Sequence, residues 1–164
     1  SELYHEGKRF GTAVMVEDTF PNILFAVDGE VYDIEGFSTI AIGGAYSIDK
    51  LWRHENGLPW FADEQPSEQA KQRVEQILTA CDWKVDVVLS HTCPAKYTPI
   101  EAYFSGIDQS RVDKSTEYWL DTIEDQLTYR HWWCGHWHIN KHINRMHFLF
   151  SGVEESAISL SRKY

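Results

Sequence analysis

A helical pattern followed by a strand pattern, between residues 66 and 89, constrains the fold of this chain most strongly. Apolar side chains recur at helical spacing after Pro66-Ser67, and Ser67 is the expected N-cap. Residues 85–89 then form a short, nearly continuous apolar run, the pattern of a strand that is covered on both faces. A helix that leads into such a strand predicts a layered α/β domain with mixed β-sheets flanked by helices.

Further elements are expected on both sides of this unit. Residues 23–27 and 30–34 flank Asp28-Gly29, which is the two-residue signature of a type I′ hairpin. Residues 39–42 predict a buried strand that ends in Gly43-Gly44, where the backbone can turn sharply. The remaining patterns predict an ordered loop over residues 45–65, a second helix over 115–128, and strands over 131–134, 146–150 and 157–160.

Composition excludes several classes of protein. Of the 164 residues, 43% are hydrophobic and 24% are charged, and no stretch approaches the roughly 18 apolar residues of a membrane span. The formal net charge of −10 disfavours nonspecific binding to a nucleic-acid backbone. The odd number of cysteines (Cys81, Cys93 and Cys134) and the absence of a signal-peptide pattern predict a reducing, cytoplasmic setting for a single domain.

Three histidines follow two of the expected strands. His91 comes directly after the 85–89 strand, and His136 and His138 follow the 131–134 strand beyond Gly135. Side chains at i and i+2 of an extended chain point to the same side, so we expect His136 and His138 to face one site. Neutral imidazole is the commonest protein ligand for Zn, Fe, Mn and related ions, so the three histidines predict a metal site.

Two alternatives involve the cysteines beside these histidines. The chain has no C-x-x-C pair, which argues against a structural zinc site, and Cys134 is expected to be a small buried hydrophobe. A nucleophilic Cys93 remains open, although the sequence identifies no third group to orient a Cys-His pair. Lys50 and Arg53, in the 45–65 loop, are candidates for contact with a substrate phosphate, with solvated loop charges as the alternative.

The two histidine segments resemble motifs of a known family. Residues 90–94 (S-H-T-C-P) and 135–138 (G-H-W-H), about 45 positions apart with a helix between them, are similar to the last two motifs of the calcineurin-like metallophosphoesterases. Residues 43–47 (G-G-A-Y-S) resemble a segment of a bacterial and phage branch of that superfamily. The resemblance implies that the chain is the C-terminal half of a calcineurin-like αββα sandwich, a single partial domain.

The resemblance also implies a dinuclear metal site and a bridging hydroxide that attacks a phosphoester. His91 and His136 would bind the second metal and His138 the first, with Mn, Fe, Zn or Ni as the two divalent ions. The family's earlier motifs are missing, because this sequence contains no Asp-x-His, no Gly-Asp and no Asn-His. We therefore expect the catalytic His and the bridging Asp upstream of Ser1. We also expect this chain alone to be inactive, holding one metal ion weakly and a pair hardly at all.

Two other functions remain open at this point. The first is a non-catalytic binding or assembly module that self-associates through exposed sheet edges. The second is a mononuclear metal enzyme with a three-histidine site, which predicts stoichiometric binding of one metal ion.

Overall fold

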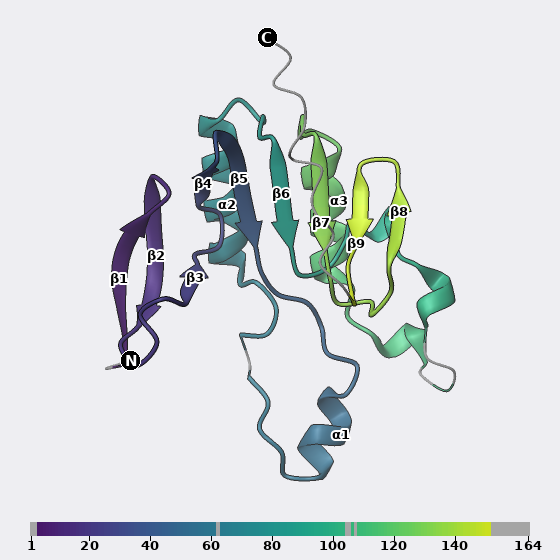
Figure 1. Ribbon diagram of the computed structural model, residues 1–164. Coiled ribbons are helices and arrows are strands. Elements are labelled where there is room, and N and C mark those ends of the chain that lie inside the picture. The colour runs from purple at the N-terminus through teal and green to yellow at the C-terminus, as the bar shows by residue number, and fades with distance from the viewer. Residues whose placement is uncertain (1–2, 62, 104–105, 107, 152–164) are drawn as a thin grey trace.

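A computed structural model describes residues 3–61, 63–103, 106 and 108–151 of the chain (Figure 1). Its larger sheet has six strands in the order β4-β5-β6-β7-β9-β8. The four inner strands run parallel and the two edge strands antiparallel, so the sheet is mixed. The strands span Val31–Ile34 (β4), Phe37–Ile42 (β5), Val87–Ser90 (β6), His131–Cys134 (β7), Lys141–Ile143 (β8) and Met146–Phe148 (β9).

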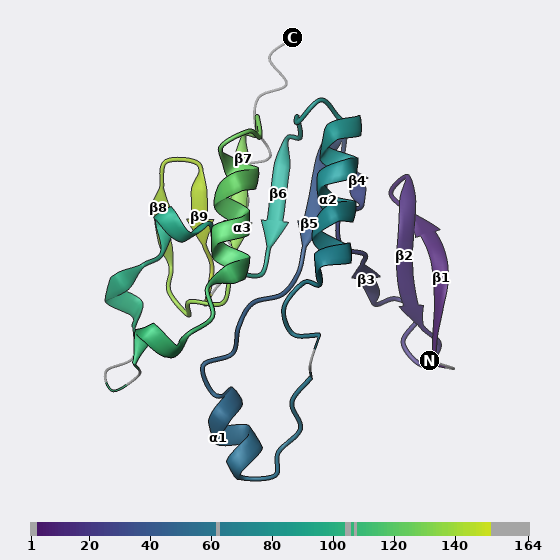
Figure 2. The same cartoon turned by 180° about the vertical axis from the view of Figure 1, so that it is seen from behind.

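Two helices cover one face of this sheet. Helix α2 (Glu68–Ala80) connects β5 to β6, and α3 (Ser115–Glu124) connects β6 to β7. They lie behind the sheet in Figure 1 and in front of it in Figure 2. Right-handed crossovers between parallel strands that are added in one direction place successive helices on the same face, which accounts for this layer. A short helix, α1 (Lys50–Glu55), interrupts the 45–65 loop, and three single turns of 3₁₀ helix follow β6, namely η1 (Ala95–Tyr97), η2 (Ile100–Ala102) and η3 (Gln109–Arg111).

The main core lies between the sheet and the two helices. Ile40, Val88, Trp132 and Met146 are register neighbours on four adjacent strands, and each is at most 1% exposed. Buried side chains from both helices, including Val74 and Leu78 of α2 and Leu120 and Ile123 of α3, belong to the same cluster. The helix and strand predicted between residues 66 and 89 therefore form the centre of the domain.

A smaller sheet packs against the β4 edge of the large one (Figure 1). It contains β1 (Tyr4–Arg9), β2 (Thr12–Glu17) and β3 (Leu24–Ala26), all antiparallel. Val14 and Val16 of β2 pack with Tyr32 of β4, and the Tyr32 hydroxyl donates to the Ala13 carbonyl at 2.9 Å. This second cluster contacts the large sheet at Tyr32 of β4 and Ala41 of β5.

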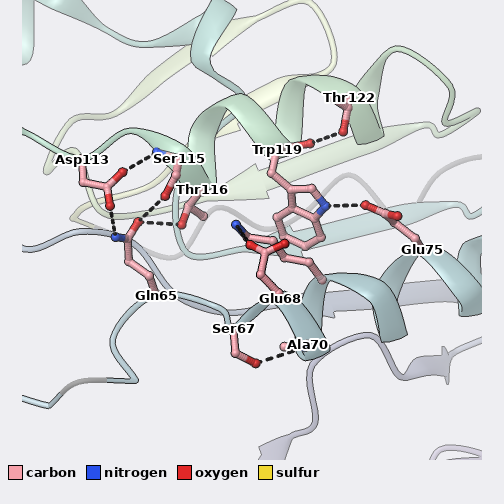
Figure 3. Close-up of polar contacts among 11 residues, drawn as sticks. Gln65, Ser67, Glu68, Ala70, Glu75, Asp113, Ser115, Thr116, Trp119 and Thr122 are labelled. Atoms are coloured by element: carbon pink, nitrogen blue, oxygen red, sulfur yellow. Dashed lines mark hydrogen bonds and ion pairs between the residues drawn. The ribbon is translucent and has the colours of Figure 1, made fainter.

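Polar contacts connect α2 to α3 (Figure 3). The Trp119 indole N–H donates to Glu75 Oε1 at 2.8 Å. Ahead of α2, the Gln65 amide accepts from Thr116 Oγ1 at 2.8 Å. Ser67 Oγ accepts from the Ala70 N–H at 3.1 Å, so the predicted N-cap is confirmed.

The predicted hairpin at Asp28-Gly29 is wrong. β3 pairs with β2 and β4 pairs with β5, so the segments on either side of Asp28-Gly29 belong to different sheets. A type I′ turn needs positive φ at both central residues, and of these two described residues only Gly29 has it, at +83°. The Asp28 carboxylate instead accepts from the Gly43 N–H at 2.7 Å. The sequence pattern identified a turn but could not show which strands pair across it.

Other boundaries differ slightly from the predictions. The second helix ends at Glu124, and Thr128 lies in a bridge instead, where its N–H donates to the Trp83 carbonyl at 2.9 Å. The predicted strand over 131–134 is confirmed, and that over 146–150 ends at Phe148. The strand predicted over 157–160 lies outside the described residues.

None of the helices in the described part of the chain combines the length and the apolar character that crossing a bilayer requires.

Candidate functional site

His91 and His136 meet at the carboxyl ends of two adjacent parallel strands, β6 and β7. The Gly135 N–H donates to the His91 carbonyl at 3.0 Å, which fixes the two strand ends together. The Nδ1 atom of His136 lies 3.2 Å from the Nε2 atom of His91. Two histidines 45 positions apart in the sequence are therefore in direct contact.

The backbone that carries His136 and His138 is bent. His136 has φ +64° and His138 has φ +50°, and the Trp137 N–H donates to the Gly135 carbonyl at 2.7 Å. The segment is therefore not extended as expected, although both imidazoles line the same cavity, so the expectation that they face one site is met. The His138 ring instead stacks on Phe150, with the ring centroids 4.8 Å apart. Left-handed conformations of residues other than glycine cost on the order of 1–3 kcal/mol each and cluster at functional sites.

Partial desolvation favours the neutral form of the paired imidazoles, although His91 is exposed and His136 is only half-buried. Burial, the nearby His91 and the nearby His138 together lower the pKa of His136 to about 4, against a smaller opposing effect of Glu64. Burial also lowers the pKa of His91, with Glu64 opposing and His138 adding to that change. Both rings are therefore uncharged at neutral pH, which is the form that binds metal ions.

The two nitrogens of the pair are spaced as two imidazole ligands of one metal ion are, whereas the third histidine is not arranged with them. Nitrogen atoms 3.2 Å apart, each at the roughly 2.0–2.1 Å typical of zinc–imidazole bonds, subtend an angle of about 100°, close to tetrahedral. In the metal-free form the same spacing allows a hydrogen bond between the two rings. Within the described residues, no group of three or more His, Cys, Asp or Glu side chains is arranged to hold a metal ion.

All three histidines line a cavity of about 450 Å³. Its walls include Tyr46 and Asp49 from the loop after β5, and Tyr103 from the segment after β6. Trp137, between the two G-H-W-H histidines, also lines it. The volume is within the range of small-molecule sites, roughly 300–1,000 Å³. The strand ends thus form one side of a pocket, and two loops form the others.

The proposed substrate contacts, Lys50 and Arg53, have other partners. Lys50 Nζ lies 4.0 Å from the centroid of the Trp60 ring, and Arg53 Nε donates to Asp49 Oδ2 at 2.7 Å. Of the described residues that line the cavity, four (Tyr46–Asp49) come from the same loop, but neither cation is among them. The structure brings the loop to the cavity and leaves these two cations outside its wall.

Glu117 also lines the cavity, although no sequence motif identified it. It is 5% exposed, its Oε1 accepts from Thr92 Oγ1 at 3.0 Å, and its Oε2 has no hydrogen-bond partner among the described residues. Burial raises the pKa of this carboxyl group, against the lowering effect of its hydrogen bonds. The sequence did contain a signal that Glu117 is unusual, because a glutamate three residues before Leu120 places a charged side chain in the apolar stripe of α3.

The cysteines beside the histidines are packed in the core. Cys93 is 0% exposed and Cys134 is 4% exposed, so the expectation of a buried Cys134 is confirmed. A hydrogen bond with Cys93 and burial both raise the pKa of the Cys134 thiol. The burial of Cys93 gives no support to a nucleophilic role, because a nucleophilic thiol must reach its substrate.

The chain was also compared with known proteins. No protein-family model, no curated protein and no solved structure matches it.

Proposed function

We propose that this chain supplies part of the active site of a metal-dependent phosphoesterase that resembles the calcineurin-like group, with His91, His136 and His138 as metal ligands. The contact between the His91 and His136 rings carries the proposal. It joins the two motifs that resemble the family, at 3.2 Å, at the carboxyl ends of parallel strands and beside a cavity. The low pKa of His136 supports it, because the ring is held in the ligand form.

The packing of the two sheets supports the sandwich part of the proposal. An αββα sandwich has two sheets face to face, each covered by helices on its outer face. Here the helices cover one face of the six-stranded sheet, and β2 of the smaller sheet contacts Tyr32 of the edge strand β4 through Val14 and Val16. We infer that further strands of a longer protein would continue this second layer.

The chain's own residues define what it would contribute. When bound, divalent ions supply a hydroxide nucleophile at neutral pH and positive charge opposite the phosphoryl oxygens. His91 and His136 would hold one ion, and His138 would hold the other after its stacking on Phe150 is broken. No carboxylate is arranged with these imidazoles among the described residues, so the chain alone would bind one ion weakly and turn over little substrate.

Metal binding tests the ligand assignment. Titration of the chain with Zn²⁺ in a calorimeter should give one weak site, and His91→Ala or His136→Ala should weaken it about tenfold or more. His5→Ala is the matched control, because His5 is an exposed imidazole paired with Asp18. Equal binding by all three variants and the unmodified chain would refute the assignment.

Activity tests the proposed reaction. A manganese-supplemented phosphatase assay should detect turnover in a version extended upstream of Ser1 and almost none in this chain. Robust turnover by this chain alone would contradict the expectation that it is catalytically inactive. No turnover by an extended version that contains the earlier motifs would contradict the phosphoesterase itself.

An assembly module is the second candidate, and an exposed part of the large sheet favours it. Leu89, Trp133 and His147 are register neighbours on the face opposite the helices, beyond the part covered by the smaller sheet. Leu89 is 41% exposed there. Light scattering on the purified chain should detect a dimer or larger species that Leu89→Lys disrupts, whereas a strict monomer would count against this candidate.

A further inference from the structure

The cavity beside the histidines has a lysine in its wall. Among the described residues that line the cavity, Lys114 is the only lysine or arginine. A lysine ammonium is charged throughout the neutral pH range, whereas imidazole titrates near neutrality. Lys114 is therefore the permanent cation of this wall, and its side chain is half-buried.

A series of contacts connects this ammonium group to the imidazoles. Lys114 Nζ donates to the Tyr103 hydroxyl at 3.1 Å and lies 5.1 Å from the centroid of that ring. The Tyr103 ring centroid is 5.9 Å from that of Trp137, and Trp137 packs edge-on against His136 with the centroids 5.2 Å apart. Lys114 is thus linked to the imidazole pair through two aromatic rings of the same wall.

The ammonium group has donors left for a ligand. An ammonium carries three N–H donors and no acceptor, and one of them goes to the neutral Tyr103 hydroxyl. Among the described residues, no carboxylate forms an ion pair with Lys114 Nζ. A partly shielded charge with free donors attracts an anion more strongly than a fully solvated one does.

The two carboxyl groups in the cavity wall have partners of their own. Asp49 Oδ2 accepts from Arg53 Nε at 2.7 Å, and Glu117 Oε1 accepts from Thr92 Oγ1 at 3.0 Å. Burial raises the pKa of Glu117, which favours its neutral form, and the charge of Lys114 opposes this change from a longer distance. The Lys114 ammonium therefore remains available to an anion in the cavity.

We propose that Lys114 binds the phosphate group of the substrate in this cavity, the role predicted from the sequence for Lys50 and Arg53; this inference rests on the proposed function. A lysine ammonium is a common point-charge partner of phosphate oxygens. A phosphate held at the imidazoles would meet a second source of positive charge in the same wall. Lys114 is a binding residue in this role, since it holds the phosphate and takes no part in breaking the ester bond.

Binding of inorganic phosphate to this chain tests the proposal without any hydrolysis. The titration is followed by phosphorus NMR line broadening at neutral pH and low salt, with no metal added. Lys114→Gln should weaken binding about tenfold, the effect of one charge-assisted hydrogen bond, and Lys114→Arg should bind within about threefold of the unmodified chain. Lys50→Gln is the matched control and should change nothing, because Lys50 lies over Trp60 outside the wall. Equal phosphate affinity in Lys114→Gln and the unmodified chain, or no binding below about 20 mM, would overturn the proposal.

A further variant separates the charge of Lys114 from its part in the wall. Tyr103→Phe removes the hydroxyl that holds Lys114 Nζ but keeps the ring and the ammonium charge. Phosphate affinity in this variant should stay within about threefold of the unmodified chain, and a loss equal to that of Lys114→Gln would overturn the charge-based role. Circular dichroism checks folding. On the unmodified chain, phosphate affinity that does not fall between about 20 and 200 mM NaCl would also overturn the proposal, because salt screens a charge-based contact.

The proposed function fails separately from this inference. In a version extended upstream of Ser1, Lys114→Gln should raise KM for a phosphomonoester about tenfold with little change in kcat, because it removes binding that substrate and transition state share. Phosphate binding that depends on Lys114, without turnover by the extended version, would keep the phosphate site and refute the phosphoesterase. Turnover with an unchanged KM in Lys114→Gln would keep the phosphoesterase and overturn the role of Lys114.

Discussion

Replacing Glu124 by Gln should destabilise the segment that carries His91. Glu124 is near the end of α3, and its side chain is 11% exposed. Its Oε2 pairs with Lys96 Nζ at 2.6 Å, and its Oε1 accepts from the Tyr129 hydroxyl at 2.7 Å. Lys96 is in η1, directly after the His91 loop, so this carboxylate links that loop to the helix.

The size of the effect follows from these contacts. Hydrogen bonds to a charged group contribute roughly 1.5–3 kcal/mol each, but the Lys96 side chain is 36% exposed, so solvent screening reduces its share. Gln is easier to bury than a carboxylate and keeps one acceptor oxygen for Tyr129, which offsets part of the loss. We expect a net loss of about 2 kcal/mol in the free energy of unfolding, or a fall of about 4–8 °C in Tm for a domain of this size.

The effect should also depend on pH. Burial raises the pKa of Glu124, but the hydrogen bonds from Lys96 and Tyr129, together with the Lys96 charge, outweigh it and lower the pKa below its ordinary value. A carboxylate with a lowered folded pKa stabilises the protein above its unfolded pKa, about 4.3, and loses that contribution as pH falls through the folded value. Urea unfolding at pH 7 and at about pH 3 should show the difference between Glu124→Gln and the unmodified chain narrowing at the lower pH.

Asp125→Asn is the matched control. Asp125 contacts the same Lys96 Nζ at 2.5 Å, but its side chain is 68% exposed. An exposed ion pair contributes about 0–1 kcal/mol, so this variant should lose at most about 0.5 kcal/mol. Equal destabilisation by the two variants, or a Glu124→Gln effect that is unchanged at low pH, would refute the reasoning.

Three further predictions follow from single contacts. Gly44→Ala should lower the free energy of unfolding by more than about 3 kcal/mol in chemical denaturation, because φ is +87° and the added Cβ would lie 2.7 Å from Pro66 Cδ. Gly57→Ala is the control, because Gly57 has φ +65° but open space around it, and it should cost only about 1 kcal/mol. Similar losses in the two variants would contradict this reasoning. Trp119→Phe should lose about 1–2 kcal/mol with its hydrogen bond to α2, and an unchanged urea midpoint would show that the bond contributes nothing. NMR titration of the imidazole signals should find a pKa near 4 for His136, and an ordinary value near 6.5 would argue against its burial.

Local patterns were sufficient for the elements that depend on neighbours in the sequence. Ser67 was predicted to begin the first long helix and does so, because an N-cap is a contact between residues three positions apart. The strand at 131–134 has the predicted bounds. The positions of His91 and His136 after two strands also followed from the sequence, whereas the parallel pairing of these strands came from the structure.

Tertiary structure decided what depends on contacts between distant residues. The turn at Asp28-Gly29 joins two sheets instead of two paired strands, because the Asp28 carboxylate binds the Gly43 N–H, 15 positions away. The contact between His91 and His136 was predictable only as a possibility, and the bend that turns His138 toward Phe150 was not predictable at all. The sequence by itself determined a layered α/β domain with two histidine motifs at strand ends. Only the packing of the chain decided which imidazoles meet and that Glu117 is buried beside them, because burial and desolvation come from residues that are remote in the sequence.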